Sequence, residues 1–244
     1  MKKTAVITGS SMGIGAAIAK ELASEKINIV INYNHSKIEA FKLLEEIRES
    51  GCMAIAVKAD VSNFQEANYL IYKSIEQFGK IDILVNNAGI SSQKLFTEIS
   101  AEDWVKTFNV NIHSMFYCTQ SAVKDMLKRH YGKIINVSSI WGITGASCEV
   151  HYSSAKAAVI GFTKSLAKEL GPSNINVNCV APGVIKTSMN GFLNSKEIED
   201  ILDETPLGRM GEASEVAKVV KFLSSSDSDF ITGQVISPNG GILI

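Results

Sequence analysis

The chain has 244 residues, of which 45% are hydrophobic and 20% are charged, and its net charge at pH 7 is −1. This length fits one large α/β domain. A net charge this close to zero produces no electrostatic field that would attract nucleic acid or an anionic membrane. No stretch reaches the length of a transmembrane helix, and the apolar run at the N-terminus is too short for a signal peptide and reads as a strand.

Cysteine usage points away from a metal site and from a disulfide framework. Cys52, Cys118, Cys148 and Cys179 are dispersed, form no C-x-x-C pair and do not cluster with the four histidines. Dispersed thiols are typical of a reducing compartment. We therefore expect no metal ion and a cytoplasmic protein.

Apolar runs of strand length alternate with segments of helical periodicity along the whole chain. The predicted strands cover residues 4–7, 27–33, 53–58, 81–85, 133–137, 175–180 and 234–237. The predicted helices cover residues 13–25, 36–50, 63–78, 101–130, 152–170, 195–202 and 213–223. This alternation is typical of βαβ crossovers and a parallel sheet covered on both faces. The sequence has no internal repeat and no linker, so we predict one domain over residues 1–244.

The first predicted strand runs into a glycine-rich turn that opens the first predicted helix. The turn reads Thr8-Gly9-Ser10-Ser11-Met12-Gly13-Ile14-Gly15. Glycines let the backbone turn sharply and approach a diphosphate, and the free N–H groups of the next helix attract that anion. The pattern G-x-x-x-G-x-G therefore favours a dinucleotide site, although its spacing differs from the G-x-G-x-x-G form.

The end of the second predicted strand indicates which dinucleotide binds. An acidic residue about 20 residues beyond the glycine turn would hold the ribose 2′-hydroxyl of NAD, but Asn34, His35 and Ser36 stand there instead. This edge favours NADP(H) over NAD(H), unless these residues merely begin the next helix. After the third strand, Asp60 and Val61 are candidates for contacts with the adenine edge, or for a plain turn.

Two amide-bearing segments fall near the same predicted sheet edge. The fourth strand is followed by Asn86-Asn87-Ala88-Gly89, in which the last two residues leave room for a flat ring and its ribose. Asn111 interrupts an apolar run within the predicted helix 101–130, where an Asn lowers helix propensity. This residue either caps a local kink or holds a water that extends a proton path from Lys156.

Tyr152 and Lys156 are spaced i, i+4, so on a helix they share one face. The ammonium group would favour the phenolate and lower the pKa of Tyr152 from about 10 towards working pH. A tyrosine tuned in this way exchanges a proton with a substrate oxygen, at which the Ser139 hydroxyl can also point. The alternative is a buried Tyr and an ordinary Lys on a structural helix.

These residues together resemble the short-chain dehydrogenase/reductase family over essentially the full length of the chain. The matching pieces are Thr8-Gly9-x-x-x-Gly13-Ile14-Gly15, Asn86-Asn87-Ala88-Gly89, Asn111, Ser139, Tyr152-x-x-x-Lys156 and Ala181-Pro182-Gly183. Within the family the chain is most similar to the bacterial 3-oxoacyl-(acyl-carrier-protein) reductases.

The resemblance implies a doubly wound, Rossmann-type sheet of seven parallel strands in a three-layer α/β/α arrangement. It implies hydride transfer between a nicotinamide and a carbonyl, with Tyr152 as general acid, Lys156 on the nicotinamide ribose, Ser139 on the carbonyl oxygen and Asn111 on a relay water. Residues lining the nicotinamide and diphosphate would be Pro182, Gly183, Ile185 and Thr187. We also expect the homotetramer that is usual in the family, formed through residues 101–130, 152–170 and the C-terminal tail.

Departures from the family pattern leave the substrate open. Met12 replaces a common Arg of the glycine turn, and Ser173 replaces an Arg that would help to receive an acidic acyl-carrier protein. Residues 91–96 and 141–149, which include the substrate-facing Trp141, resemble instead a Firmicute subgroup that contains the reductase of the 5-aminopentanone modification on elongation factor P. Glu149 would attract an amine-bearing ketone, or it is a solvated loop charge.

Three functions are therefore weighed. The first is NADPH-dependent reduction of a 3-oxoacyl thioester on acyl-carrier protein in fatty acid biosynthesis, the second is reduction of another ketone such as the aminopentanone, and the third is non-catalytic sensing of NADP(H). Residues 186–209 are expected to form a lid over the substrate, with Met189, Phe192 and Leu193 among the residues that offer an acyl chain an apolar wall.

Overall fold

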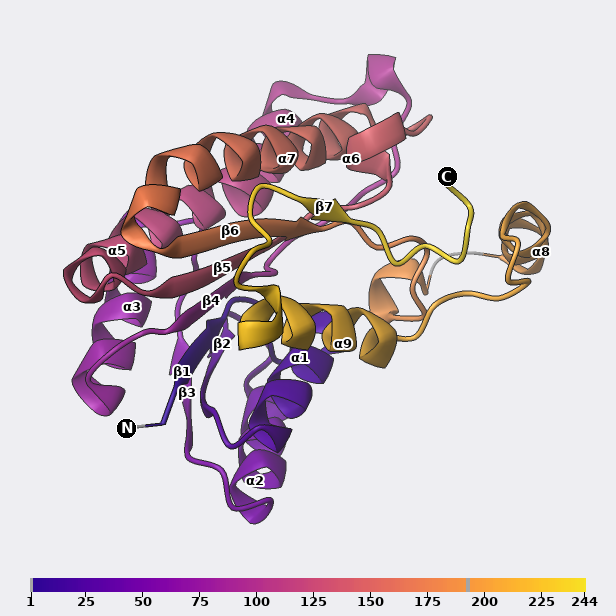
Figure 1. Cartoon of the computed structure of the whole chain (residues 1–244). Coiled ribbons are helices and arrows are strands. Elements are labelled where there is room, and N and C mark those ends of the chain that lie inside the picture. Colours follow the sequence, from indigo (N-terminus) through magenta and orange to yellow (C-terminus); the bar gives the residue numbers. More distant parts are fainter. Residues whose placement is uncertain (1, 192–193) are drawn as a thin grey trace.

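A sheet of seven parallel strands forms the centre of the molecule in the computed structural model, which describes residues 2–191 and 194–244 (Figure 1). The strands are β1 (Thr4–Ile7), β2 (Asn28–Tyr33), β3 (Ala54–Lys58), β4 (Ile83–Asn86), β5 (Gly132–Val137), β6 (Ile175–Val180) and β7 (Val235–Ile236). Their order in the sheet is β3-β2-β1-β4-β5-β6-β7, which confirms the predicted doubly wound, Rossmann-type fold.

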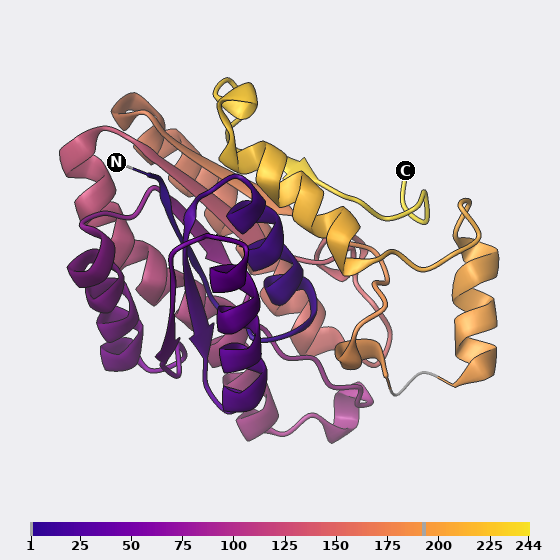
Figure 2. The ribbon, with the colours of Figure 1, turned by 90° about the horizontal axis from the view of Figure 1, so that it is seen from below.

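Helices cover both faces of the sheet (Figures 1 and 2). One face carries α1 (Gly13–Ser24), α2 (Lys37–Glu49) and α9 (Ala213–Ser224). The other carries α3 (Phe64–Phe78), α4 (Ala101–Phe108), α5 (Ser114–Arg129) and α7 (Val150–Leu170). The short α6 (Trp141–Thr144) follows β5, and α8 (Ser195–Glu204) stands out from the body of the molecule.

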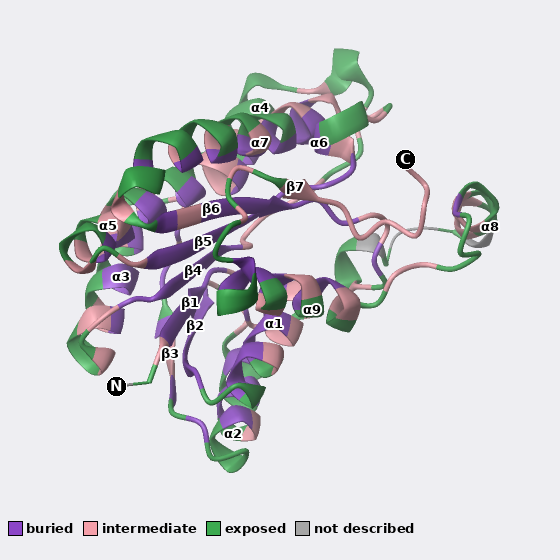
Figure 3. Cartoon of the chain, viewed as in Figure 1, coloured by how far each residue is buried: buried purple, intermediate pink, exposed green. Residues whose placement is uncertain are grey.

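An apolar core lies on each face of the sheet because successive strand residues point to opposite faces. Ala5 and Ile7 pack against the α1 side, whereas Val6 between them packs against the α3 side. The same alternation repeats on β2 and β4, and the central strands are buried throughout (Figure 3). Continuous burial explains why these strands read as unbroken apolar runs in the sequence.

The predicted helix 101–130 is interrupted by a π-helical turn, η2 (Asn109–His113). A capping box begins α4 at Ser100, and His130 ends α5 in the left-handed conformation with φ 50°. Asn111 lies in the middle of the π turn, where its Nδ2 donates to the carbonyl oxygens of Thr107 and Ile90, each at 2.9 Å. The interruption therefore coincides with the polar residue that disturbs the apolar run.

Candidate active site

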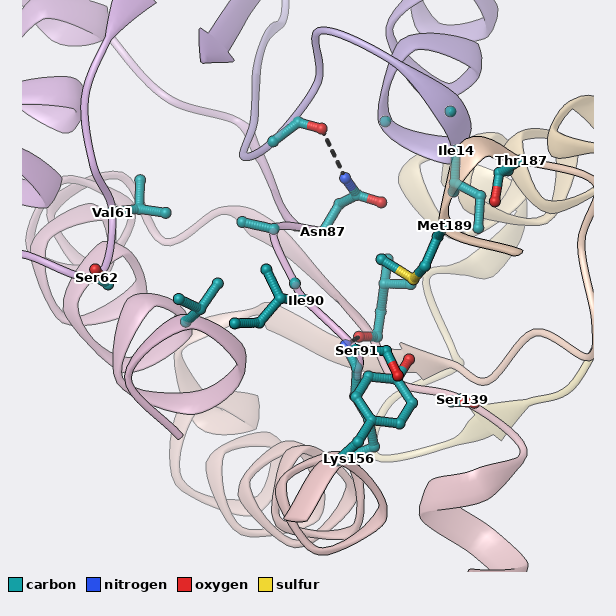
Figure 4. A pocket seen from close by; sticks show the side chains of 18 of the residues that line it. Ile14, Val61, Ser62, Asn87, Ile90, Ser91, Ser139, Lys156, Thr187 and Met189 are labelled. Carbon is teal, nitrogen blue, oxygen red and sulfur yellow. Dashed lines mark hydrogen bonds between the residues drawn. The ribbon is translucent and has the colours of Figure 1, made fainter. Parts of the chain in front are cut away.

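The loops that follow β1 to β6 meet at the carboxyl edge of the sheet and enclose a cavity of 1180 Å³. The sheet order reverses at β1, which lies between β2 and β4, and such switch points are where open α/β sheets bind ligands. Most of the residues expected at a site lie on the cavity wall: Gly9, Met12, Gly13, Ile14, Gly15, Asn34, His35, Asp60, Val61, Asn87, Ala88, Gly89, Ser139, Trp141, Glu149, Tyr152, Lys156, Pro182, Gly183, Ile185 and Thr187. Figure 4 shows Val61 and Ser62 at one end and Ser139 and Lys156 at another.

The glycine turn and the segment after β4 are locked together by hydrogen bonds. The backbone N–H groups of Asn87 and Ala88 both donate to Thr8 Oγ1 at 3.0 Å. In return Asn87 Nδ2 donates to the carbonyl oxygens of Thr8 and Gly9 at 3.0 and 3.1 Å, and Figure 4 draws one hydrogen bond from Asn87. Two motifs about 80 residues apart thus form a single rigid wall.

The glycine turn has the shape and polarity that a dinucleotide diphosphate requires. A Cβ atom on Gly15 would lie 2.5 Å from the carbonyl oxygen of Gly9, and one on Gly9 would lie 2.9 Å from Ala88 Cα. The following helix α1 has no side-chain cap and no acidic residue in its first turn, so its N–H groups stay available to an anion. These residues fit a bound nicotinamide dinucleotide.

Asn34 and His35 lie on the cavity wall just after β2. Neither side chain is a carboxylate. Ser11 and Ser36 do not reach the cavity wall. Sequence reasoning missed Asn32, whose buried side chain accepts from Gly9 N at 3.0 Å and donates to the Ala59 carbonyl at 2.9 Å. An amide inside an otherwise apolar strand was the available signal.

Asp60 lies on the cavity wall, but its carboxylate accepts hydrogen bonds from within its own turn. Its Oδ1 accepts from Ser62 N at 3.0 Å and from Ser62 Oγ at 2.6 Å. This is the Asx-turn geometry expected of a residue that ends a strand. A contact of this loop with an adenine ring would therefore come from backbone atoms or from Val61, which Figure 4 shows next to Ser62.

Tyr152, Lys156 and Ser139 are buried together at the start of α7 and beside the end of β5. Lys156 Nζ lies 5.6 Å from the centroid of the Tyr152 ring, and the Ser139 hydroxyl is hydrogen-bonded to the phenol. The shared helical face is as predicted.

The expected lowering of the Tyr152 pKa is wrong for this structure. Burial and the carboxylate of Glu149 raise the pKa of Tyr152, and the Ser139 hydrogen bond opposes them. The Lys156 ammonium donates to the Val137 carbonyl at 2.9 Å, and Lys156 is not among the groups that shift the pKa of Tyr152. Burial also lowers the pKa of Lys156, to about 8.

Asn111 lies just behind the cavity wall rather than on it. Its Oδ1 is buried without a hydrogen-bond partner, and it lies 2.7 Å from the position that a Cβ on Gly89 would take. Lys156 Nζ lies 3.3 Å from that same position. An unpaired acceptor this close to a buried ammonium group suits an ordered water between them.

Glu149 is not a solvated loop charge, because only 7% of its surface is exposed. Its Oε1 accepts from Ser91 Oγ at 2.9 Å, whereas Oε2 is buried without a partner. Burial raises the pKa of this carboxyl, and the Ser91 hydrogen bond lowers it. A carboxylate therefore forms part of the cavity wall close to Tyr152.

Sequence reasoning missed the wall contributed by α4. Its residues on the cavity are Ala101, Glu102, Val105 and Lys106, followed by Asn109 and Val110 of η2. The sequence indicated a helix but not which of its faces meets the site, because that depends on packing against α7. Ile90, Ser91 and Met189 also line the cavity (Figure 4).

Gly183 has a structural reason to be glycine. A Cβ atom there would lie 2.8 Å from Asn239 Cα in the C-terminal segment. The tail thus holds the segment of Pro182 and Gly183 in place beside the cavity. After it come η4 (Ser188–Asn190) and α8, but Phe192 and Leu193 of the expected lid lie outside the described residues.

Within residues 2–191 and 194–244, no helix is long and apolar enough to cross a membrane. The same part of the chain contains no group of three or more His, Cys, Asp or Glu side chains that could hold a metal ion.

Comparison with known proteins agrees with this geometry. A family model described as enoyl-(acyl carrier protein) reductase matches residues 9–242. The chain is 40% identical over 242 residues to the 3-oxoacyl-[acyl-carrier-protein] reductase FabG of Staphylococcus aureus, covering 99% of this chain and 98% of the relative. It is 42% identical over 243 residues to the 3-oxoacyl-[acyl-carrier-protein] reductase of Synechocystis sp., with 99% and 97% covered. The chain belongs to the short-chain dehydrogenase/reductase family of nicotinamide-dependent oxidoreductases.

Proposed function

We propose that this protein is an NADPH-dependent reductase of 3-oxoacyl thioesters carried on acyl-carrier protein, acting in the cytoplasm in fatty acid biosynthesis. One observation carries the proposal: a single cavity joins a diphosphate-shaped glycine turn to a buried Tyr152, Ser139 and Lys156. The names of the relatives support the substrate, since they act on 3-oxoacyl groups of the carrier protein.

In this function each buried group has a distinct task. Tyr152 donates a proton to the ketone oxygen, and Ser139, already hydrogen-bonded to the phenol, holds that same oxygen. Lys156 binds the ribose beside the nicotinamide, and Asn111 Oδ1 accepts from the water that resupplies the proton. The bound nicotinamide supplies the hydride.

The direct test measures which bond is reduced. Purified protein is incubated with NADPH and either acetoacetyl thioester or crotonyl thioester, and the products are identified by mass spectrometry. The proposal requires 3-hydroxybutyryl thioester from the first and no saturated product from the second. Reduction of crotonyl thioester alone would favour the enoyl reduction named by the family model. If no ketone were turned over, non-catalytic sensing of NADP(H) would be the remaining function.

The preference for NADPH over NADH is tested at Asn34, which lies on the cavity wall directly after β2. We expect Asn34→Asp to lower the ratio of kcat/KM for NADPH to kcat/KM for NADH by about tenfold or more, because a carboxylate repels the 2′-phosphate and binds the 2′-hydroxyl. The matched control is Asn34→Ser, which adds no charge and should keep the preference. An unchanged ratio in Asn34→Asp would place the 2′-phosphate elsewhere.

The comparisons do not favour the second candidate substrate, a ketone that carries an amine such as the aminopentanone, and one observation motivates a test of it. Glu149 lines the cavity, and its Oε2 is buried without a hydrogen-bond partner, so a protonated amine bound beside this residue would be attracted to its carboxylate. We expect Glu149→Gln to raise KM for amine-bearing ketones by about tenfold or more and to leave KM for neutral ketones unchanged. Equal effects on both classes would remove this candidate.

Two further expectations belong to the same proposal. Residues 186–209 would act as a lid, and the chain would assemble as a homotetramer through α4, α5, α7 and the tail. Exposed apolar side chains on the relevant surfaces support assembly: Trp104, Phe116, Phe230 and Ile244. Light scattering measures the assembly directly.

A further inference from the structure

Asn32 is an amide at a strand position where an apolar side chain is expected. Along β2, Ile31 and Tyr33 pack on the α1 face of the sheet, and Val30 packs on the other face. Asn32 shares the face of Val30 because successive side chains alternate, and it is only 2% exposed. A buried amide costs free energy unless its polar atoms are hydrogen-bonded, so the partners of this side chain indicate its role.

Both polar atoms of the Asn32 side chain have backbone partners in loops that line the cavity. Oδ1 accepts from Gly9 N at 3.0 Å, in the turn after β1, and Nδ2 donates to the Ala59 carbonyl at 2.9 Å, after β3. The main chain of Asn32 adds to this brace, because its carbonyl accepts from Ser10 N at 3.0 Å. Asn32 therefore joins the loops that follow the two neighbours of β2 in the sheet.

The two peptide groups on either side of Gly9 are each held at both ends. Their N–H groups, on Gly9 and Ser10, donate to the side chain and the carbonyl of Asn32. Their carbonyl oxygens, on Thr8 and Gly9, accept from Asn87 Nδ2. Because the N–H and C=O of a trans peptide point in opposite directions, Asn32 and Asn87 hold the glycine turn from opposite sides.

This arrangement determines which backbone groups can meet an anion. The N–H groups of Gly9 and Ser10 already donate to Asn32, whereas the first N–H groups of α1, which begins at Gly13, have no partner within the helix. A Cβ on Gly15 would lie 2.5 Å from the Gly9 carbonyl oxygen, so the start of α1 packs directly against the held turn. A shift of the turn would therefore shift these N–H groups too.

We propose that Asn32 is a positioning residue for the adenosine half of the dinucleotide: it fixes the glycine turn relative to the loop after β3, and through the turn it fixes the start of α1. Asn34 and Val61, the candidates for the 2′-phosphate and the adenine edge, each follow two residues after a braced position, Asn32 and Ala59. This inference rests on the proposed function, in which the cavity binds NADPH.

The test measures how Asn32→Ala binds the adenosine half of the cofactor. Isothermal titration calorimetry gives the Kd of 2′-phospho-ADP-ribose, which carries the adenosine, the 2′-phosphate and the diphosphate but no nicotinamide. We expect this Kd to rise by about tenfold or more, because the Gly9 N–H loses its acceptor and the turn is held from one side only. The KM for NADPH should rise in parallel, while kcat at saturating NADPH stays unchanged.

Asn178→Ala on β6 is the matched control. Asn178 is also a buried strand amide, whose Oδ1 accepts from Gln234 N at 3.1 Å and whose Nδ2 donates to the Ile231 carbonyl at 2.8 Å. It does not line the cavity, so its loss should lower stability and leave the Kd of 2′-phospho-ADP-ribose unchanged. If Asn32→Ala also kept the wild-type Kd, the amide would serve stability alone and the inference would be overturned.

A measurement on wild type tests the inference even if Asn32→Ala does not fold. Amide hydrogen exchange is followed residue by residue with and without 2′-phospho-ADP-ribose. Exchange at Gly9 and Ser10 should be slow in both states, whereas exchange at Gly13, Ile14 and Gly15 should slow on binding. Fast exchange at Gly9 and Ser10 in the free protein would overturn this inference alone. Failure of wild type to bind 2′-phospho-ADP-ribose would overturn the proposed use of NADPH and this inference with it.

Discussion

Replacing Tyr152 with Phe is expected to lower kcat for ketone reduction by at least about 100-fold while NADPH still binds. The variant loses the hydroxyl that donates the proton and keeps the ring that packs beside Lys156, at 5.6 Å from its ammonium. Because the rest of the cavity wall is unchanged, the effect should fall on kcat rather than on the nucleotide Kd. Steady-state NADPH oxidation with acetoacetyl thioester, together with a fluorescence titration of NADPH, measures both.

Tyr69→Phe is the control for this substitution. Tyr69 is 48% exposed on α3 and does not line the large cavity, so loss of its hydroxyl should leave kcat unchanged. Equal rates of NADPH oxidation in wild type and Tyr152→Phe would show that Tyr152 is not the proton donor. A non-catalytic sensor would show no ketone-dependent oxidation in any of the three proteins.

Gly15→Ala is expected to weaken NADPH binding by at least about tenfold and to lower the free energy of unfolding by about 1–3 kcal/mol. The new Cβ would lie 2.5 Å from the Gly9 carbonyl oxygen and 2.6 Å from Asn87 Nδ2. These atoms belong to the hydrogen-bonded wall between the glycine turn and the segment after β4. Relief of the clash must therefore displace the backbone that would face the diphosphate in the proposed function.

The control is Gly161→Ala on the exposed side of α7, where a Cβ meets no atom within 4 Å. Gly161 does not line the cavity, so this variant should bind NADPH as tightly as wild type does. Denaturant unfolding and NADPH titration of both variants give the comparison. If Gly15→Ala bound NADPH as tightly as wild type does, the glycine turn would not be the diphosphate site.

Most of the fold and most of the candidate site residues could be predicted from local patterns in the sequence. Unbroken apolar runs such as β1 and β4 mark strands that are buried on both faces, so their existence and order follow from the sequence. Predicted ends differ from the observed ones by a residue or two. The π turn around Asn111 could not be located from local pattern, and the hydrogen bond that Asn111 donates to Ile90 there joins residues 21 positions apart.

The pKa shifts in the site could not be predicted from the spacing of residues along the sequence. The i, i+4 spacing correctly placed Lys156 beside the Tyr152 ring, but the direction of the tyrosine pKa shift depends chiefly on burial. Glu149 looked like a loop charge because its hydrogen-bond partner, Ser91, is 58 residues away in the sequence. Such contacts are set by tertiary packing, which a single sequence does not display.

The most direct test of a reductive site centred on Tyr152 follows the hydride itself. NADPH carrying deuterium at both positions of nicotinamide C4 is incubated with wild-type protein and acetoacetyl thioester, and the product is analysed by mass spectrometry. We predict 3-hydroxybutyryl thioester with one deuterium on C3, formed in equal amount to the NADPH consumed, and almost none with Tyr152→Phe. Product without deuterium, or NADPH consumed without product, would contradict it.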